Sequence, residues 1–332
     1  MEPVAGGGLR FSLMFTLAEL ETAANVVYRT MPPTPERRWP LLDKRCGARV
    51  WVKHENYAPT GAFKVRGGLV YFDALVANGQ KPAGTVAATR GNHGQSVGLA
   101  AKQHGIPAAV IVPHGNSVAK NDAMRALGVE VIEEGHDFQA SFEAAARLAH
   151  DRAWHRMPTF DPLLVKGVAS YALELFRAAP DLDTVYVPIG QGSGICGTLA
   201  ARNALGLRTR IVAVVASGAP AYARSLAAGH AISCEVTTRI ADGMACRVPD
   251  QRALDMIRVG IDRVVEVTDD QIEEAMRVIF DDVHTVAEGA GAASLAALLI
   301  ERDRLAGTSV GVVLSGGNVD RDAFARVIAT NL

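Results

Sequence analysis

Short apolar runs rich in β-branched residues recur along the chain and alternate with longer amphipathic stretches. The runs predict strands at Arg49–Lys53, Thr85–Thr89, Ala108–Val112, Glu130–Ile132, Thr184–Val187, Arg210–Val215, Arg263–Val267 and Ser309–Leu314. Alanine-rich stretches with helical periodicity predict helices at Ser96–Gln103, Ser117–Leu127, Phe138–His150, Gly194–Ala204, Asp269–Phe280 and Ala290–Arg304. Because this alternation is typical of parallel sheets covered by helices on both faces, we expect an α/β fold.

Several predicted strands run directly into glycine-rich turns that precede a helical pattern. These turns are AATRGNHGQS (Ala87–Ser96), VPIGQGSGICG (Val187–Gly197) and VVLSGGNVD (Val312–Asp320). In open α/β sheets, ligands bind at the carboxyl ends of strands, where helix N-termini present unpaired N–H groups. The turns therefore predict one ligand that is held from several sides.

The stretch GQGSG, Gly190–Gly194, has the composition of an anion-binding loop. Glycines let the backbone approach an anion closely, and the helix that follows supplies N–H donors. The loop lacks a Walker lysine and a GxGxxG spacing, which argues against ATP and dinucleotides. Taken alone, the loop is also consistent with a plain strand-to-helix turn.

Lys64 lies in TGAFKVRGG, between Phe63 and Val65 and with glycines on both sides. A lysine amine is a poor nucleophile while it is protonated, and a partly apolar pocket would lower its pKa. A surface lysine is the commoner case for this residue type, since lysine is rarely buried without a partner.

Asn92, His93 and Ser315 follow predicted strands. Each has a structural alternative: asparagine as a turn former, histidine as a hydrogen-bonded core residue, and serine as a helix cap. The combination of these residues with Lys64 and the glycine-rich loop indicates a ligand more specifically than any one of them alone. A lysine able to form a Schiff base, a phosphate cradle and polar strand-end groups together fit pyridoxal phosphate.

Composition and charge exclude several classes of protein. The 332 residues carry a formal net charge of −1 without clustered basic residues, so no nucleic-acid partner is expected. The four cysteines form no CxxC pair or zinc-type spacing, which favours free thiols in a reducing compartment. The first residues lack a signal-peptide pattern, and the longest apolar run, Ala290–Ile300, is too short to span a bilayer. We therefore expect a cytoplasmic protein without a membrane partner.

Five short stretches follow one another along the chain in this order: KHENYAPTGAFKVRGG, GNHGQS, GQGSG, AEGAGAA and SGGN. In these stretches the chain resembles the fold-type II pyridoxal-phosphate enzymes, in particular the threonine/serine dehydratase and serine racemase family. The resemblance extends from about Thr16 to the end of the chain. It implies two open parallel-sheet domains with the cofactor in the cleft between them. Residues 76–159 would form a small domain inserted into a large domain made of residues 1–75 and 160–332.

The resemblance also implies roles for individual residues. Lys64 would be the Schiff-base lysine, with Phe63 near the cofactor ring and Ser315 facing the pyridine nitrogen. Asn92 would hydrogen-bond the phenolic oxygen of the cofactor, and Glu288 matches the glutamate of the family's E-P-x-G-A stretch, with Gly289 in place of the proline. The phosphate would be held by Gly190, Gln191, Gly192, Ser193 and Gly194, and the substrate carboxylate by the loop containing Arg90, Gly91, Asn92 and His93.

The activity implied is an ammonia-releasing β-elimination from a β-hydroxy amino acid. Lys64 would remove the α-proton, and Ser315 is too weak an acid to keep the pyridine nitrogen protonated. Negative charge then stays close to Cα, which favours prompt loss of the β-substituent over transamination. The chain ends soon after Asn318, so we expect no C-terminal regulatory domain and a catabolic or specialised role. Members of the family commonly form homodimers.

Arg90 stands where the family usually has serine. That serine is the second base of serine racemases, and an arginine with a pKa above about 12 is a very poor proton acceptor. The planar guanidinium suits a carboxylate, so we expect Arg90 to contact the substrate or a second acidic group on it. A salt bridge to one of the protein's own carboxylates is the alternative.

Two further differences from the family's sequence pattern affect the expected metal binding and substrate preference. The stretch Val215–Ser225 matches the family's divalent-cation site but contains no acidic residue, so no magnesium or calcium is expected there. The phosphate loop is not the usual tetraglycine, and Phe160–Leu175 lacks the family's glutamine. Both changes put threonine in doubt and make 3-hydroxyaspartate or phenylserine plausible substrates.

Three other functions remain open from the sequence. They are an amino-acid racemase, a pyridoxal-phosphate enzyme that eliminates a non-hydroxyl leaving group, and a non-catalytic amino-acid sensor. The retention of Lys64, Asn92 and Ser315 argues against the sensor. Further pocket residues are expected in Asp242–Arg247.

Overall fold

The computed structural model describes residues 15–329. The N-terminal stretch that lacks a signal-peptide pattern lies almost wholly outside the described residues. Within them, no helix combines the length and the apolar character that crossing a bilayer requires.

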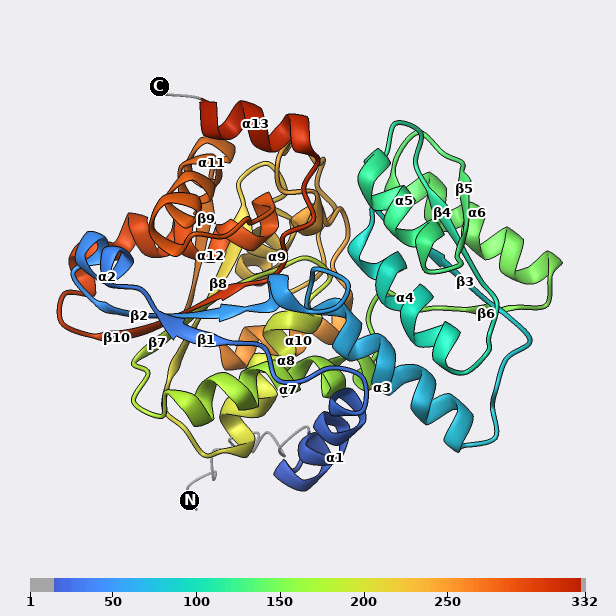
Figure 1. The fold of residues 1–332 in the computed structure, drawn as a ribbon, viewed down its shortest axis with the longest axis horizontal. Helices are drawn as coiled ribbons and strands as arrows, with labels where there is room; N and C mark the ends of the chain where they lie inside the picture. Colours follow the sequence, from blue (N-terminus) through green and yellow to red (C-terminus); the bar gives the residue numbers. More distant parts are fainter. Residues whose placement is uncertain (1–14, 330–332) are drawn as a thin grey trace, which may run out of the picture.

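The strands form two separate sheets (Figure 1). The six-stranded sheet, here the large sheet, has the order β1-β2-β10-β7-β8-β9, and the four-stranded small sheet has the order β5-β4-β3-β6. The strands are β1 (Glu36–Arg38), β2 (Arg49–His54), β3 (Thr85–Ala88), β4 (Ala108–Val112), β5 (Glu130–Glu133), β6 (His155–Arg156), β7 (Thr184–Pro188), β8 (Arg210–Ala216), β9 (Arg263–Val267) and β10 (Ser309–Leu314).

The predicted α/β fold with parallel sheets is confirmed, with one exception at an edge. Every neighbouring pair is parallel except β1, which pairs antiparallel with β2. All strands expected from the apolar runs form. Only β1 and β6 were missed, because three and two residues are too few to show a periodicity.

The helices are α1 (Leu17–Tyr28), α2 (Pro40–Cys46), α3 (Lys64–Ala77), α4 (Asn92–Gln103), α5 (Val118–Ala126), α6 (Phe138–Asp151), α7 (Pro162–Ala178), α8 (Ser193–Ala204), α9 (Ala221–Ala228), α10 (Gln251–Gly260), α11 (Asp269–Val278), α12 (Gly289–Glu301) and α13 (Arg321–Ala329). A π-helical turn, Ile279–Val283, continues α11. The six predicted helices form. The amphipathic pattern missed α1, α2, α3, α7, α9, α10 and α13.

Helix α3 was not predicted, because two adjacent glycines are unfavourable inside a helix. In the structure Gly67 and Gly68 lie inside the helix, at its contacts with α7 and α4. A Cβ at Gly67 would lie 2.9 Å from the carbonyl oxygen of Leu164 in α7, and a Cβ at Gly68 would overlap the Ser96 hydroxyl in α4. The glycines therefore permit close helix packing rather than a bend.

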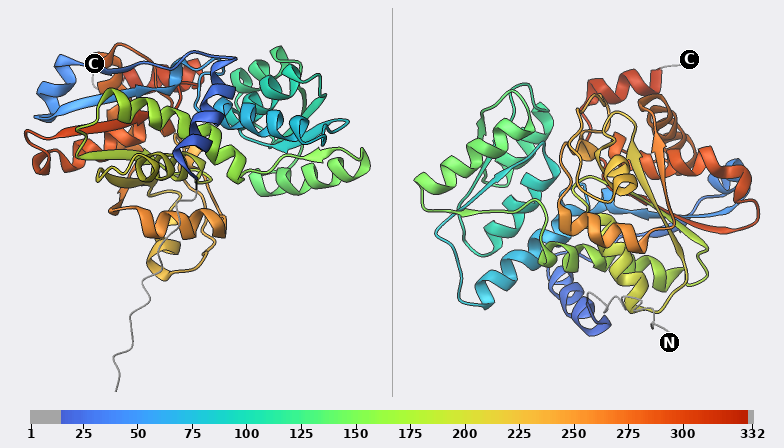
Figure 2. Two further views of the ribbon diagram at one scale, coloured as in Figure 1. Left: turned by 90° about the horizontal axis from the view of Figure 1, so that it is seen from below. Right: turned by 180° about the vertical axis from the view of Figure 1, so that it is seen from behind.

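Apolar side chains cover both faces of the large sheet. One core cluster packs α11 and α12 against the sheet, and a second packs α7, α8 and α10 against the opposite face. The small sheet is covered in the same way by α4 and α5 on one face and α6 on the other. Figure 2 shows these two parts side by side, with α3 at their junction. The small sheet takes its strands from residues 85–156, and the domain boundaries at 76 and 159 stay a prediction.

Candidate active site

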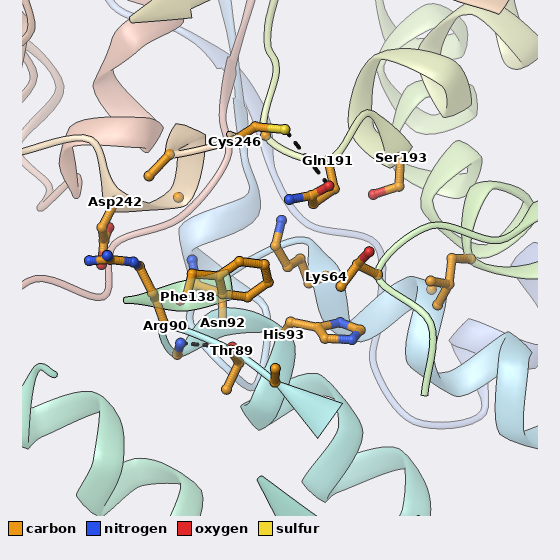
Figure 3. Close-up of a pocket in the computed structure, with 18 of the residues that line it drawn as sticks. Lys64, Thr89, Arg90, Asn92, His93, Phe138, Gln191, Ser193, Asp242 and Cys246 are labelled. Atoms are coloured by element: carbon orange, nitrogen blue, oxygen red, sulfur yellow. Dashed lines mark hydrogen bonds between the residues drawn. The ribbon is translucent and has the colours of Figure 1, made fainter. Parts of the chain in front are cut away.

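A pocket of about 810 Å³, open to solvent, lies where the two sheets meet (Figure 3). Its walls come from segments far apart in the sequence. They are the start of α3 at Lys64, the turn after β3 at Thr89–His93, the turn after β7 at Gly190–Ser193, and the segment Asp242–Cys246. Two of these segments follow the carboxyl ends of parallel strands, β3 in the small sheet and β7 in the large sheet, which is where ligands bind in open α/β sheets.

Lys64 is the first residue of α3, and its side chain points into the pocket (Figure 3). Its Nζ lies 4.4 Å from the centre of the Phe63 ring. Desolvation lowers the pKa of Lys64 to about 8, although the carboxylates of Glu288 and Asp242 oppose that shift. The amine is therefore neutral far more often than that of an exposed lysine.

The turn after β7 forms a cradle of backbone N–H groups. Helix α8 begins at Ser193 without a side-chain cap, and its N-cap Gly192 has a φ of 101°. A Cβ at Gly192 would lie 2.8 Å from the Cβ of Ala253, and one at Gly190 would overlap the Gly243 carbonyl oxygen. The Tyr222 hydroxyl supports the turn by donating to the Gln191 carbonyl at 3.1 Å. The first N–H groups of α8 are thus left for an anion.

Asn92 begins α4 and lines the pocket. Its Nδ2 donates to Glu288 Oε1 at 2.5 Å, and its Oδ1 accepts from Asn318 Nδ2 at 2.9 Å. Glu288 is buried at the N-cap position of α12. The structure therefore brings together Asn92, Glu288 and Asn318, the first and last of which lie 226 positions apart in the sequence.

Phe63 and Ser315 are not part of the pocket lining. The Phe63 N–H donates to the Ser315 carbonyl at 3.1 Å, and the Ser315 hydroxyl donates to the Ala290 carbonyl at 3.2 Å. The Phe63 ring packs edge-on against Tyr171 and borders Gly194. Their contacts with a cofactor ring stay a prediction.

Arg90 and His93 line the pocket on the small-sheet side. The Nε of Arg90 and the Nε2 of His93 are buried without a hydrogen-bond partner in the described chain. Figure 3 shows the Arg90 side chain extending toward Asp242. No salt bridge of Arg90 forms within residues 15–329, so the alternative of an internal ion pair is not realised there. Burial lowers the pKa of His93 to about 4, so its imidazole is neutral near pH 7.

Sequence reasoning missed Lys120, which lies in the first turn of α5. Its Nζ pairs with Asp242 Oδ2 at 2.8 Å and Glu288 Oε2 at 3.1 Å. A lysine in the first turn of a helix carries no pattern that would have revealed these contacts. The expectation of pocket residues in Asp242–Arg247 is met by Asp242, Gly243, Ala245 and Cys246.

The four cysteines are free and buried. Across residues 15–329, no three or more His, Cys, Asp and Glu side chains are grouped so that they could hold a metal ion. The expected lack of a cation at Val215–Ser225 stays a prediction, since a cation site can also use backbone carbonyl groups.

A family model described as "Pyridoxal-phosphate dependent enzyme" matches residues 27–316. The chain belongs to this family of pyridoxal-phosphate-dependent enzymes. The enzyme is 33% identical over 324 residues to an L-threonine ammonia-lyase of Thermotoga maritima, covering 96% of this chain and 79% of the relative. It is 27% identical to an L-threo-3-hydroxyaspartate ammonia-lyase of Saccharomyces cerevisiae, over 95% of this chain and 96% of the relative.

A solved structure supports the family assignment. The structure of maize serine racemase superposes with a TM-score of 0.86 and 28% identity, covering 94% of this chain and 96% of that chain. The predicted fold-type II architecture and the predicted cofactor are thereby confirmed.

The pocket residues fit pyridoxal phosphate. The uncapped start of α8 and the closely packed glycines before it suit a phosphate, and Lys64 offers an amine of lowered pKa. Gly190–Gly194 would hold the phosphate, Lys64 would bond the aldehyde carbon, and Asn92 would donate to the phenolic oxygen. These assignments remain predictions for the individual residues.

The lowered pKa of Lys64 predicts how the cofactor-free enzyme captures pyridoxal phosphate. Only the neutral amine attacks the aldehyde, so the capture rate should rise with pH and level off above a midpoint near 8. Visible absorption followed after mixing apoenzyme and cofactor between pH 6 and 10 measures this rate. A midpoint above about 10, the ordinary lysine value, would contradict the pocket's effect on Lys64.

Proposed function

We propose that this enzyme is an ammonia-lyase that eliminates the β-hydroxyl of a β-hydroxy amino acid to give a 2-oxo acid and ammonia. The observation that carries the proposal is Lys64, an amine of lowered pKa facing the uncapped start of α8 across one pocket. Relatives named as ammonia-lyases of threonine and of 3-hydroxyaspartate support the reaction class.

Bound pyridoxal phosphate supplies an electron sink for the pair released at the substrate Cα. Lys64 acts beside it as the base that takes the α-proton, which its lowered pKa permits near neutral pH. Asn92 is held as a hydrogen-bond donor by Glu288 and Asn318 and orients the ring. Phe63 shields the amine from water on one side.

The start of α4 is suited to the substrate carboxylate. The N–H groups of Gly91 and Gly94 donate to Thr89 Oγ1 at 2.8 and 3.2 Å, which braces the turn. The N–H groups of Asn92 and His93 remain in the first helical turn, where no intrahelical partner exists. We infer that they bind the carboxylate, with the neutral His93 ring beside it.

We further propose that the preferred substrate carries a second acidic group, as 3-hydroxyaspartate does. Arg90 supports this preference, because its guanidinium lies in the pocket lining without a salt bridge in the described chain. The Arg90 side chain is half-buried and its Nε is buried without a partner, and a carboxylate of the substrate could accept from it in the bidentate manner that suits a guanidinium.

Racemisation is the alternative suggested by the similarity to maize serine racemase. It needs a second base on the face of the substrate opposite Lys64. The residue before Gly91 is Arg90, and a guanidinium is a very poor proton acceptor. L-Serine that keeps its enantiomeric purity after long incubation with the enzyme would support elimination over racemisation.

The test is release of ammonia and 2-oxo acid from threonine, serine, both 3-hydroxyaspartate diastereomers and phenylserine, with Lys64→Ala as the control. Release from one or more of these, lost in the variant, supports the proposal. No release from any, with cofactor confirmed as bound, would contradict hydroxyl elimination and shift the assignment to another leaving group.

Arg90→Ser tests the acidic preference. Loss of the guanidinium should raise KM for 3-hydroxyaspartate by about tenfold or more, since a charged hydrogen bond contributes about 1.5–3 kcal/mol. KM for serine or threonine should change little. Steady-state kinetics on both kinds of substrate, with exposed Arg224→Ser as a matched control, measures the difference. Equal changes for acidic and neutral substrates would contradict the role.

We also propose that the enzyme is a cytoplasmic homodimer that acts on a small amino acid without a nucleic-acid or membrane partner. Its buried, free cysteines are compatible with a reducing compartment. Light scattering coupled to size-exclusion chromatography would measure the assembly state.

A further inference from the structure

Lys120 reaches from the small-sheet side of the pocket to the large-sheet side. It lies in α5, whose neighbours are α4 and β5, whereas its partners Asp242 and Glu288 belong to segments packed on the large sheet. Its side chain is only 7% exposed. Its methylene groups fill the space beside Gly91, where a Cβ would overlap them. A buried ammonium is thus held across the pocket between two carboxylates.

The carboxylate of Glu288 divides its two oxygens between two partners. Oε2 accepts from Lys120 Nζ at 3.1 Å, and Oε1 accepts from Asn92 Nδ2 at 2.5 Å. Both partners donate hydrogen bonds, so Glu288 must present acceptor oxygens to each of them. Burial and the neighbouring Asp242 raise the pKa of Glu288, whereas Lys120 lowers it. The lysine therefore favours the ionised form of a carboxyl group that would otherwise tend to take up a proton.

The orientation of the Asn92 amide is determined by this arrangement. Asn318 Nδ2 donates to the Thr60 carbonyl at 2.8 Å and to Asn92 Oδ1 at 2.9 Å, so the Asn92 oxygen faces Asn318. The Asn92 nitrogen then faces Glu288 and keeps a second N–H for the pocket. A neutral Glu288 could present its own O–H to Asn92 and would weaken this preference.

We propose that Lys120 is a positioning residue of this active site: through Glu288 it holds Asn92 as a hydrogen-bond donor toward the cofactor. This inference rests on the proposed cofactor site at Lys64. Lys120 need not touch the substrate, because its ammonium is already shared by Asp242 and Glu288. Its effect reaches Asn92 through two hydrogen bonds in series, and a third, from Asn92, would carry it to the cofactor.

Lys120→Met tests the inference, because methionine keeps most of the length and removes the charge. The dissociation constant of pyridoxal phosphate from the apoenzyme should rise about tenfold or more, since removing one partner of a buried ion pair is strongly destabilising. The pH titration of the visible absorption of the bound cofactor should also shift, and kcat should fall more than KM rises. Lys120→Arg keeps the charge and should stay closer to the wild type in all three measurements.

Two matched controls separate positioning from structural support. Ser117→Ala removes the hydrogen bond from Ser117 Oγ to Asp320 Oδ1 at 2.7 Å and the N-cap hydrogen bond that Ser117 Oγ accepts from the Lys120 backbone N–H at 3.1 Å. It keeps the Lys120 ammonium and both of its carboxylate partners. It should lower the melting temperature and leave the cofactor titration unchanged. Lys102→Met removes an exposed lysine of α4 and should have neither effect.

The double variant Lys120→Met/Glu288→Gln provides the sharpest result. A glutamine oxygen still accepts from Asn92 and needs no neighbouring cation, so part of the cofactor affinity lost in Lys120→Met should return. Strictly additive losses would overturn the inference. So would a Lys120→Met enzyme with wild-type cofactor affinity and titration, a Ser117→Ala enzyme with the same titration shift, or Lys120→Arg matching Lys120→Met.

The measurements of cofactor affinity and of the absorption titration do not depend on the proposed reaction. If the substrate panel gives no product while Lys120→Met still shifts cofactor affinity and titration, the proposed function fails and the inference stands. If products form and Lys120→Met leaves the cofactor unaffected, the inference fails and the proposed function stands.

Discussion

Lys64→Ala should lower ammonia release by at least about 10³-fold, because in the proposed mechanism the variant loses both the covalent anchor of the cofactor and the base. The position of the Lys64 amine suits both roles: it lies at the start of α3, in a pocket that is also lined by Ser193, the first residue of α8. The fold should survive, because the substitution removes a desolvated amine and leaves Ala at a helix start, where it is well tolerated. Product assays and circular dichroism of the purified variant measure the two effects.

Covalent attachment provides the second measurement for Lys64. After reduction with borohydride, mass spectrometry of the wild type should locate the cofactor on the peptide that contains Lys64, and the variant should carry none. The exposed Lys102→Ala serves as the control and should keep both activity and attachment. An active Lys64→Ala enzyme, or attachment at another lysine, would contradict the assignment of this site.

Gly190→Ala should weaken binding of pyridoxal phosphate by about tenfold or more, because overpacking of a tightly packed site costs about 1–3 kcal/mol. A Cβ at this position would overlap the carbonyl oxygen of Gly243, and a backbone atom cannot move aside as a flexible side chain can. The turn after β7 must then shift and carry the first N–H groups of α8 away from the phosphate. Titration of the apoenzyme with cofactor, followed by absorption or fluorescence, measures the loss.

Gly206→Ala is the control for that variant. Gly206 follows α8, has a φ of 67° and has open space where a Cβ would be placed. Its substitution should cost about 1 kcal/mol of unfolding free energy through backbone strain and leave cofactor affinity unchanged. If Gly190→Ala instead keeps wild-type affinity with only a comparable loss of stability, the turn does not hold the phosphate.

The strands and their turns could be predicted from local patterns. Runs such as Ala108–Val112 are short, continuous apolar segments typical of a buried parallel strand, and glycines after β3, β7 and β10 indicate where a ligand can approach. The helices were less predictable. Helix α3 contains Gly67 and Gly68, which indicate a turn until α4 and α7 are seen packed against them.

The sequence by itself determined the α/β fold class, Lys64 as the candidate lysine and the glycine-rich turn before α8, because each depends on residues adjacent in the chain. Only the tertiary structure decided which charges meet in the pocket. Lys120 contacts Glu288, 168 positions away, and Asn92 contacts Asn318, 226 positions away. It also showed that Arg90 has no salt bridge in the described chain. Such pairings follow from how two sheets face each other across a pocket, and no local propensity or periodicity encodes that arrangement.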